Sequence, residues 1–193
     1  MPTHVRATAN LHWAGPGWSV AKDIADLEAI VAAGATRIGA QECRREVIVG
    51  FLERNPEWSV AFDEDTLDKP AYRVVPMFYR RDLYSCEPRF VTVPIGFLGT
   101  AGAGEDRIEH KVIACPAFTD LETGARFRDF NLHQIVSAFN SKVPKAERDR
   151  RKAAWMRVNV AVRGVVEASL AEGVPVIGGG DWNATRDQVG PLG

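Results

Sequence analysis

The chain has 193 residues, of which 46% are hydrophobic and 25% are charged. This balance is typical of an ordinary globular protein, and the length fits one domain, residues 1–193, with a sizeable core. With 24 basic and 25 acidic residues the net charge is −1, which gives no general argument for a polyanion-binding protein. The sequence contains neither a signal-peptide pattern nor a run of the roughly 18 apolar residues that span a membrane. Three widely spaced cysteines favour reduced thiols, so we expect a cytoplasmic protein.

The N-terminal part of the sequence alternates strand and helix patterns. A short strand pattern over 4–11 is followed by a glycine–proline turn, and apolar residues at helical spacing then predict a helix over 20–33. Ser19 is the expected N-cap of this helix and Gly34 its expected left-handed C′ residue. The next two elements are a strand over 36–42 and a short helix over 44–54.

The pattern changes after Trp58, where short strand-like runs separated by turn residues replace the alternation. These runs lie at 58–62, 72–80, 88–94, 108–117 and 125–132. A long helix is predicted over 145–172, flanked by Pro144 and Gly173, and a strand over 174–178 follows it directly. Helix–strand units on both sides of a run of antiparallel-type strands predict an α/β (α+β) fold, a layered β-sandwich flanked by helices.

Polar side chains stand at the C-terminal ends of several expected strands. They are Asn10, Glu42, His133 and the pair Asp181 and Asn183. Ligand crevices form at strand ends in α/β sheets. Carboxylate and amide oxygens favour a hard divalent cation such as Mg²⁺, with Mn²⁺ as an alternative, and such a cation binds phosphate as well. These residues therefore indicate a metal–phosphate site.

Short motifs at the same strand ends resemble those of the endonuclease/exonuclease/phosphatase superfamily. They are Thr8-Ala9-Asn10, Gln41-Glu42, Asn131-Leu132-His133 and Gly180-Asp181-Trp182-Asn183-Ala184, with Pro76-Met77-Phe78-Tyr79-Arg80-Arg81 similar to the superfamily's central strand. That superfamily includes DNase I-like nucleases, sphingomyelinases and inositol polyphosphate phosphatases. Each motif alone occurs often by chance, but their order and strand context make the signal more specific. The resemblance spans nearly the whole chain and implies a DNase I-like fold.

The resemblance also implies a role for each residue in a Mg²⁺-dependent phosphoester hydrolase. Glu42 would be the main metal ligand, and Asn10 would assist it. Asp181 would activate or orient the attacking water, and Asn183 would hold that water or a phosphoryl oxygen. His133 would act as a general acid or as a hydrogen-bond donor to the phosphate. A nuclease (phosphodiesterase) acting on nucleic acid is preferred to a phosphatase acting on a phosphorylated small molecule or lipid headgroup.

Each of these residues also has a purely structural interpretation. Asp181, Asn183 and Asn10 belong to the residue types that dominate turns after strands. Glu42 precedes a predicted helix, where an acidic side chain is stabilised by the helix dipole. His133 is compatible with a half-buried histidine at a strand end.

One part of the superfamily's pattern has no match in the sequence. The pattern continues after the Gly-Asp-x-Asn strand with further strands and a Ser-Asp-His motif, and residues 186–193 match neither. We therefore expect a domain that lacks its last strands: a fragment, a fold completed by a partner chain, or an inactive protein. The alternative function is a non-catalytic or truncated binding module with the same fold.

Overall fold

The computed structural model describes residues 4–11, 17–62, 75–96, 110–135 and 137–184. Within these ranges the helices are α1 (Val20–Ala32), α2 (Arg45–Arg54) and α3 (Lys145–Ala171). The strands are β1 (Arg6–Asn10), β2 (Arg37–Gln41), β3 (Trp58–Ala61), β4 (Met77–Arg80), β5 (Tyr84–Glu87), β6 (Phe90–Pro94), β7 (His110–Ala114), β8 (Ala117–Asp120), β9 (Arg126–His133) and β10 (Val176–Asp181). No helix of the described ranges is long and apolar enough to cross a membrane.

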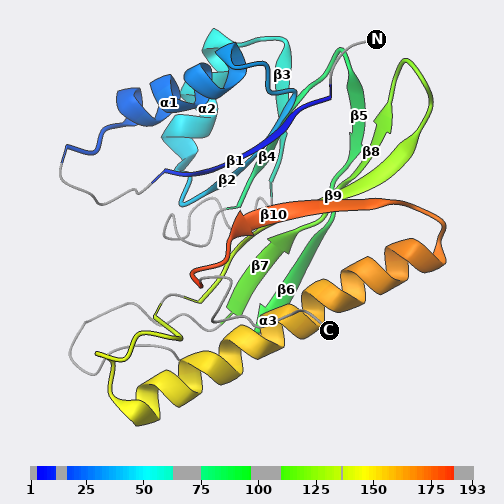
Figure 1. The fold of residues 1–193 in the computed structure, drawn as a ribbon. Coiled ribbons are helices and arrows are strands. Elements are labelled where there is room, and N and C mark those ends of the chain that lie inside the picture. The colour runs from blue at the N-terminus through cyan, green and yellow to red at the C-terminus, as the bar shows by residue number, and fades with distance from the viewer. Residues whose placement is uncertain (1–3, 12–16, 63–74, 97–109, 136, 185–193) are drawn as a thin grey trace.

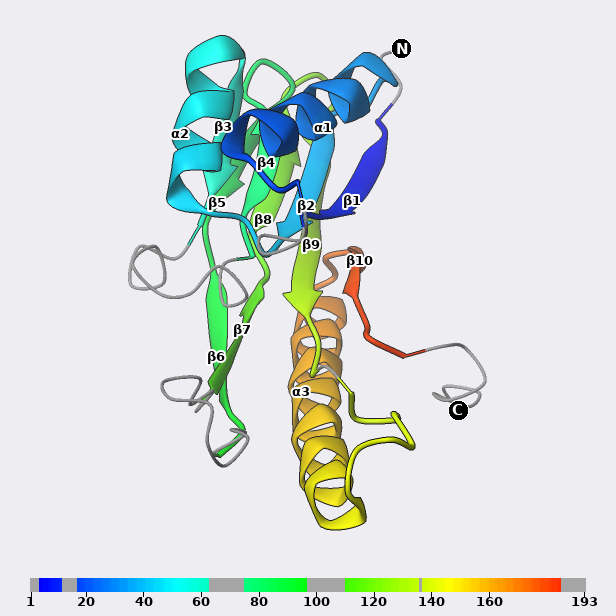
Figure 2. The ribbon, with the colours of Figure 1, turned by 90° about the vertical axis from the view of Figure 1, so that its left-hand side faces the viewer.

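Two β-sheets pack face to face between helices (Figures 1 and 2). The first sheet has the strand order β1-β2-β4-β3, in which β1 and β2 are parallel and the other pairs antiparallel. The second has the order β5-β8-β9-β7-β6, and β10 lies parallel to β9. Helices α1 and α2 cover the first sheet, and α3 packs against the second. The predicted layered sandwich with flanking helices is thereby confirmed.

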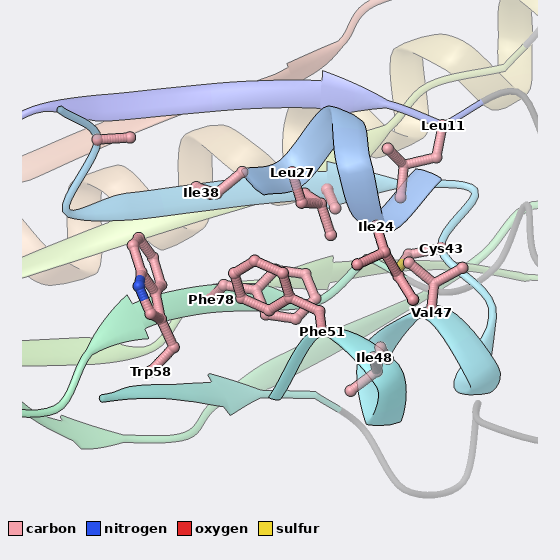
Figure 3. Packing of buried hydrophobic residues seen from close by; sticks show 12 residues of the cluster. Leu11, Ile24, Leu27, Ile38, Cys43, Val47, Ile48, Phe51, Trp58 and Phe78 are labelled. Atoms are coloured by element: carbon pink, nitrogen blue, oxygen red, sulfur yellow. The ribbon is translucent and has the colours of Figure 1, made fainter. Parts of the chain in front are cut away.

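The local signals at α1 also agree with the structure. The Ser19 hydroxyl accepts a hydrogen bond from the amide nitrogen of Lys22 at 3.1 Å, and Gly34 has the left-handed φ of +93° that ends the helix. The apolar cluster between α1, α2 and the first sheet includes Ile24, Leu27, Ile38, Phe51 and Phe78 (Figure 3). The predicted helical spacing is therefore the spacing of the residues that α1 buries.

Strands β7 and β8 form one interrupted strand along the same edge of β9. The pairing with β9 continues from one to the other without a change of register. Pro116, which stands between them, has no N–H to donate, while its carbonyl oxygen accepts a hydrogen bond from the Asp129 amide at 3.1 Å. The sequence predicted a single strand over 108–117, whose described part corresponds to β7, and Pro116 separates β7 from β8. Strand β5 and all but the first residue of β8 were not predicted.

Strand β10 runs through three glycines to Asp181, which corrects the predicted strand over 174–178. A Cβ added to these glycines would stand 1.8 Å from the Phe130 ring at Gly178, 2.6 Å from the Arg6 guanidinium at Gly179 and 2.1 Å from a backbone oxygen of β9 at Gly180. Real side chains do not approach so closely, so the glycines allow β10 to lie tightly against its neighbours. They therefore continue the strand beyond residue 178, where it was predicted to end.

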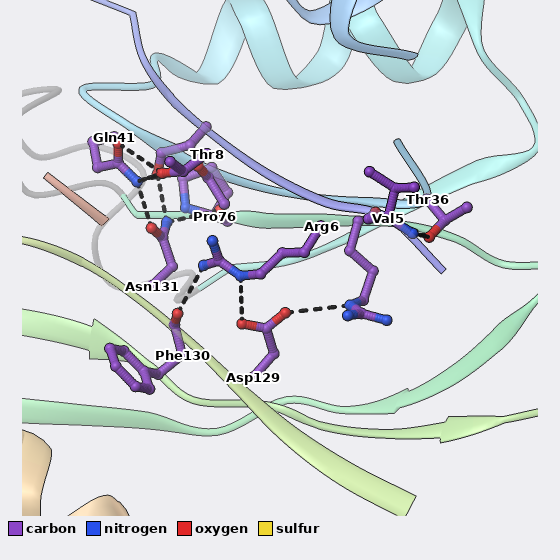
Figure 4. Close-up of polar contacts among 12 residues, drawn as sticks. Val5, Arg6, Thr8, Thr36, Gln41, Pro76, Asp129, Phe130 and Asn131 are labelled. Atoms are coloured by element: carbon purple, nitrogen blue, oxygen red, sulfur yellow. Dashed lines mark hydrogen bonds and ion pairs between the residues drawn. The ribbon is translucent and has the colours of Figure 1, made fainter. Parts of the chain in front are cut away.

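The layer between the two sheets has an apolar half and a polar half. The apolar half lies among β3, β4, β5, β7 and β8 and includes Ala61, Met77, Tyr84, Val112, Ala114 and Phe118. The polar half lies between β1–β2 and β9–β10 and consists of Arg6, Arg37, Gln41, Asp129 and Asn131 (Figure 4). The candidate site lies at the end of the polar half, where these four strands stop.

Candidate active site

The residues that the sequence singled out come together at the ends of four strands. Asn10, His133 and Asp181 are the last residues of β1, β9 and β10, and Glu42 directly follows β2. Strands β1 and β2 are parallel, as are β9 and β10, and Asp181 is paired in register with His133. Because parallel strands end at the same edge of a sheet, each of these pairings brings two strand ends together.

The side chain of Asn10 links the two carboxylates of the site. Its Nδ2 donates to Asp181 Oδ2 at 2.7 Å and to Glu42 Oε1 at 3.3 Å. Glu42 comes from the first sheet and Asp181 from the second, so this amide also joins the two sheets at the site. Two acidic groups are thus held around one point, an arrangement that favours a cation.

His133 lies beneath these carboxylates. Its Nε2 is 3.5 Å from Glu42 Oε1 and 4.0 Å from Asp181 Oδ2, distances of ion-pair contact rather than of good hydrogen bonds. The side chains are 2% exposed for His133, 16% for Glu42 and 30% for Asp181. The imidazole therefore forms the floor of the site, and Asp181 is the group most open to an arriving molecule.

Two residues of the site have backbone conformations that are uncommon for non-glycine residues. Glu42 has a φ of +55° and Asn183 a φ of +49°. Asparagine tolerates this region, and the Asn183 amide nitrogen donates to Asp181 Oδ1 at 2.9 Å, which closes a short Asx-type turn. For glutamate the same backbone conformation is strained, and such strained residues cluster at functional sites. Glu42 stands two residues before Arg44, the N-cap of α2, so it lies outside the first turn of that helix.

A buried pair of amide side chains supports the site from below. Gln41 Nε2 donates to Asn131 Oδ1, and it also lies 3.1 Å from both Thr8 Oγ1 and the Gly39 carbonyl oxygen. Asn131 Nδ2 in turn donates to the Ala40 carbonyl oxygen at 2.6 Å (Figure 4). Gln41 and Asn131 precede Glu42 and His133 closely in the sequence motifs. The motif itself is therefore the signal for this pair, although the sequence assigned them no role.

A buried ion triad completes the polar half. It was not predicted from the sequence. Asp129 is fully buried, and its two oxygens accept from Arg6 Nε at 2.9 Å and from Arg37 Nε at 3.2 Å. Burial raises the pKa of the Asp129 carboxyl, while the two guanidinium groups act in the opposite direction. Charged residues inside otherwise strand-like runs were the available signal, but such residues usually face solvent.

The site has the chemistry to hold a hard divalent cation. Among the residues that the structure describes, no group of three or more His, Cys, Asp and Glu side chains is arranged around a common metal position. Mg²⁺ does not require one, because it keeps several waters and binds through one or two carboxylates plus a substrate phosphate. The Glu42 carboxylate, with the Asn10 side chain beside it, fits that donor set.

Comparison with known proteins identifies the fold. No protein-family model matches the sequence, and no curated protein matches it. Among solved structures, a mannosyl-6-phosphatase of Bacteroides thetaiotaomicron is similar over 96% of this chain and 67% of its own, with a TM-score of 0.65 and 19% identity. An endonuclease/exonuclease/phosphatase family protein of the same organism has a TM-score of 0.64 and 20% identity, over 96% of this chain and 66% of its own.

A third similar structure comes from D. rerio. It is TDP2 complexed with a single strand DNA product, with a TM-score of 0.64 and 14% identity, over 94% of this chain and 61% of that chain. This chain therefore spans about two thirds, or slightly less, of the lengths of these structures. The resemblance seen in the sequence is confirmed at the level of the fold: the chain has the DNase I-like fold of the endonuclease/exonuclease/phosphatase proteins.

Proposed function

We propose that this protein is a Mg²⁺-dependent phosphoester hydrolase, with Mn²⁺ as an alternative metal, and that phosphodiesters such as nucleic acid are preferred to phosphomonoesters. One observation carries the proposal: Asn10 holds the carboxylates of Glu42 and Asp181 together over the buried ring of His133. Hydrolysis of a phosphoester needs a place for a cation, a base for water and a donor for the phosphoryl oxygens. This cluster offers a group for each.

The similar structures support this class of reaction and leave the substrate open. One is a mannosyl-6-phosphatase and another was solved with a DNA product. A phosphorylated small molecule or a lipid headgroup therefore remains the second candidate after nucleic acid. The free thiols of Cys43, Cys86 and Cys115 support the cytoplasmic location that we include in the proposal.

The residues divide the work as follows. Glu42 and Asn10 would hold the metal, which when bound neutralises charge on the phosphate. Asp181, which is more exposed than Glu42, orients the attacking water and takes up its proton. His133, whose Nε2 lies against both carboxylates, would donate from this nitrogen to a phosphoryl oxygen or to the leaving oxygen. Asn183, fixed by its turn, orients the water or a second phosphoryl oxygen.

Hydrolysis of bis(4-nitrophenyl) phosphate and nicking of plasmid DNA test the proposal. Both should require Mg²⁺ and stop on addition of EDTA. Asp181→Ala and Glu42→Gln should each lower kcat by about 100-fold or more, because each removes a group that acts on the reacting atoms. Asp149→Ala is the control, since this exposed carboxylate on α3 pairs with Lys145 at 2.6 Å and lies outside the site.

The results separate the two functions considered. Turnover that survives both EDTA and Asp181→Ala would refute the assignment. Binding of Mg²⁺ or inorganic phosphate without any turnover would instead support the non-catalytic binding module. A substrate panel of plasmid DNA, RNA, a sugar phosphate and an inositol phosphate then ranks the substrate classes by kcat/KM.

A further inference from the structure

Gln134 directly follows His133, and its side chain is fully buried. Its Nε2 donates to Asn159 Oδ1 at 2.8 Å and approaches the Trp155 carbonyl oxygen at 3.4 Å, both in the middle of α3. Its Oε1 accepts from the Ile135 amide nitrogen at 3.0 Å. The carboxamide is therefore held from two sides, and its shortest hydrogen bond goes to a side chain of α3.

The backbone of the same residue holds the segment that carries Asp181 and Asn183. The Gln134 amide nitrogen donates to the Asp181 carbonyl oxygen at 2.8 Å, and the Gln134 carbonyl oxygen accepts from Asn183 Nδ2 at 3.0 Å. A second bond from α3 reaches this segment, because Trp155 Nε1 donates to the Trp182 carbonyl oxygen at 3.2 Å. Helix α3 thus bonds Trp182 directly and reaches the neighbouring Asp181 and Asn183 through Gln134.

Apart from Ser169 near its C-terminal end, the fully buried side chains of α3 are apolar. Ala154, Trp155, Val158 and Val162 are buried against the second sheet. Within such a contact, a hydrogen-bonded glutamine–asparagine pair stabilises the fold no more than apolar residues of the same shape would. The pair stands where α3 passes the site, so a role in the site is a better explanation than packing alone.

We infer that Gln134 is a positioning residue for the reaction proposed above: through Asn159 it fixes the direction of the Asn183 side chain relative to His133. The inference rests on the proposed function for the role of Asn183, and on the hydrogen bonds alone for the coupling. Asn159 supplies the fixed point because it belongs to a long helix, whereas Gln134 and Asn183 lie in short connecting segments.

The coupling can be tested without any enzymatic activity. The side-chain amide signals of Asn183 in a ¹⁵N–¹H NMR spectrum, assigned with Asn183→Asp, should shift and exchange faster with water in Gln134→Leu and in Asn159→Leu. Asn159→Asp keeps an acceptor for Gln134 and should restore the wild-type signals. Val162→Ala is the matched control, since it removes buried volume from the same helix face and leaves every bond of the pair. The inference is overturned if Gln134→Leu changes these signals no more than Val162→Ala does.

The effect on the reaction is a separate measurement with bis(4-nitrophenyl) phosphate. Gln134→Leu and Asn159→Leu should each lower kcat by about 10- to 100-fold with KM within about threefold, because the reacting groups are misplaced while the binding surface remains. The double variant should be no worse than either single one, and Asn159→Asp should keep most of the wild-type kcat. An unchanged kcat in Gln134→Leu contradicts the inference. Absence of turnover in the wild type contradicts the proposed function instead, and the NMR comparison still decides the coupling.

Discussion

The apolar and polar halves of the layer between the sheets join the same two sheets by different means. In the apolar half, contact is made by rings and aliphatic chains, as where Phe118 stacks on Phe127 with ring centroids 5.7 Å apart. In the polar half the main contacts are directed bonds between named atoms, such as Arg6 to Asp129 and Gln41 to Asn131. Apolar packing tolerates many shapes, whereas hydrogen bonds and ion pairs require one geometry. The candidate site continues the half that is fixed by geometry.

Arg37 marks the boundary between the two halves. Its Nε bonds Asp129 at 3.2 Å, while its guanidinium carbon lies 4.4 Å from the Phe127 ring centroid and 5.0 Å from that of Tyr84. The same charge is therefore neutralised on one side and covered by aromatic faces on the other. This arrangement lets a buried cation stand beside an apolar cluster.

The largest expected difference between the halves is the cost of a shape-conserving substitution. Asp129→Asn keeps the shape and removes the charge that Arg6 and Arg37 share, so we expect a loss of about 3 kcal/mol or more in the free energy of unfolding. Met77→Leu in the apolar half should cost less than about 1.5 kcal/mol. Chemical denaturation measures both. Equal losses would show that the two halves do not differ in this respect.

A smaller loss is expected where β10 presses on the polar half. Gly179→Ala would place a Cβ 2.6 Å from Arg6 Nη1 and displace the guanidinium from Asp129, which should cost about 1 to 3 kcal/mol. Gly164→Ala on α3 is the control, because a Cβ there has open space and alanine favours the helix by about 1 kcal/mol. Thermal unfolding should move in opposite directions in the two variants. A stable Gly179→Ala would mean that Arg6 is not confined.

The amide pair should show a measurable coupling. Gln41→Leu and Asn131→Leu each leave a buried amide without its partner, so each should cost about 1 to 2 kcal/mol. The double variant removes both amides together and should cost less than the two losses added. A double-mutant cycle from urea unfolding gives the coupling free energy. Simple additivity would contradict the bond between the two side chains.

The smallest effect concerns pH at the edge of the apolar half. The backbone amides of Thr123 and Glu122 donate to Asp120 Oδ1 and hold the pKa of this carboxyl below its usual range. A lowered folded-state pKa stabilises the fold above the unfolded pKa of roughly 4, and this contribution is lost as the pH falls through the folded value. Asp120→Asn should therefore lower the Tm at pH 7, and its difference from wild type should shrink below about pH 4. A difference independent of pH would exclude the charge as the cause.

Much of this architecture follows from local signals in the sequence. The helical spacing and the caps at Ser19 and Gly34 placed α1, and the flanking Pro144 and Gly173 placed α3, which spans Lys145–Ala171. The site residues were recognised because each stands at a strand end, and strand ends are visible in the alternation of apolar and turn residues. The extent of β10 was underestimated, since glycines indicate a turn unless the neighbours that press on them are known.

The sequence by itself determined the described helices, most of the strands, the layered class and the set of polar residues at the strand ends, because those depend on neighbours a few positions away. Only the tertiary structure decided which polar groups face each other. Arg6 and Asp129 are 123 residues apart, and Gln134 and Asn159 are 25 apart, in different elements. A charged or amide residue has the same local pattern whether it faces water or a buried partner. The packing of one sheet on the other, and of α3 on the second sheet, decides between the two. Burial of an unpaired polar group costs free energy, whereas a buried hydrogen-bonded pair is stable in one geometry only.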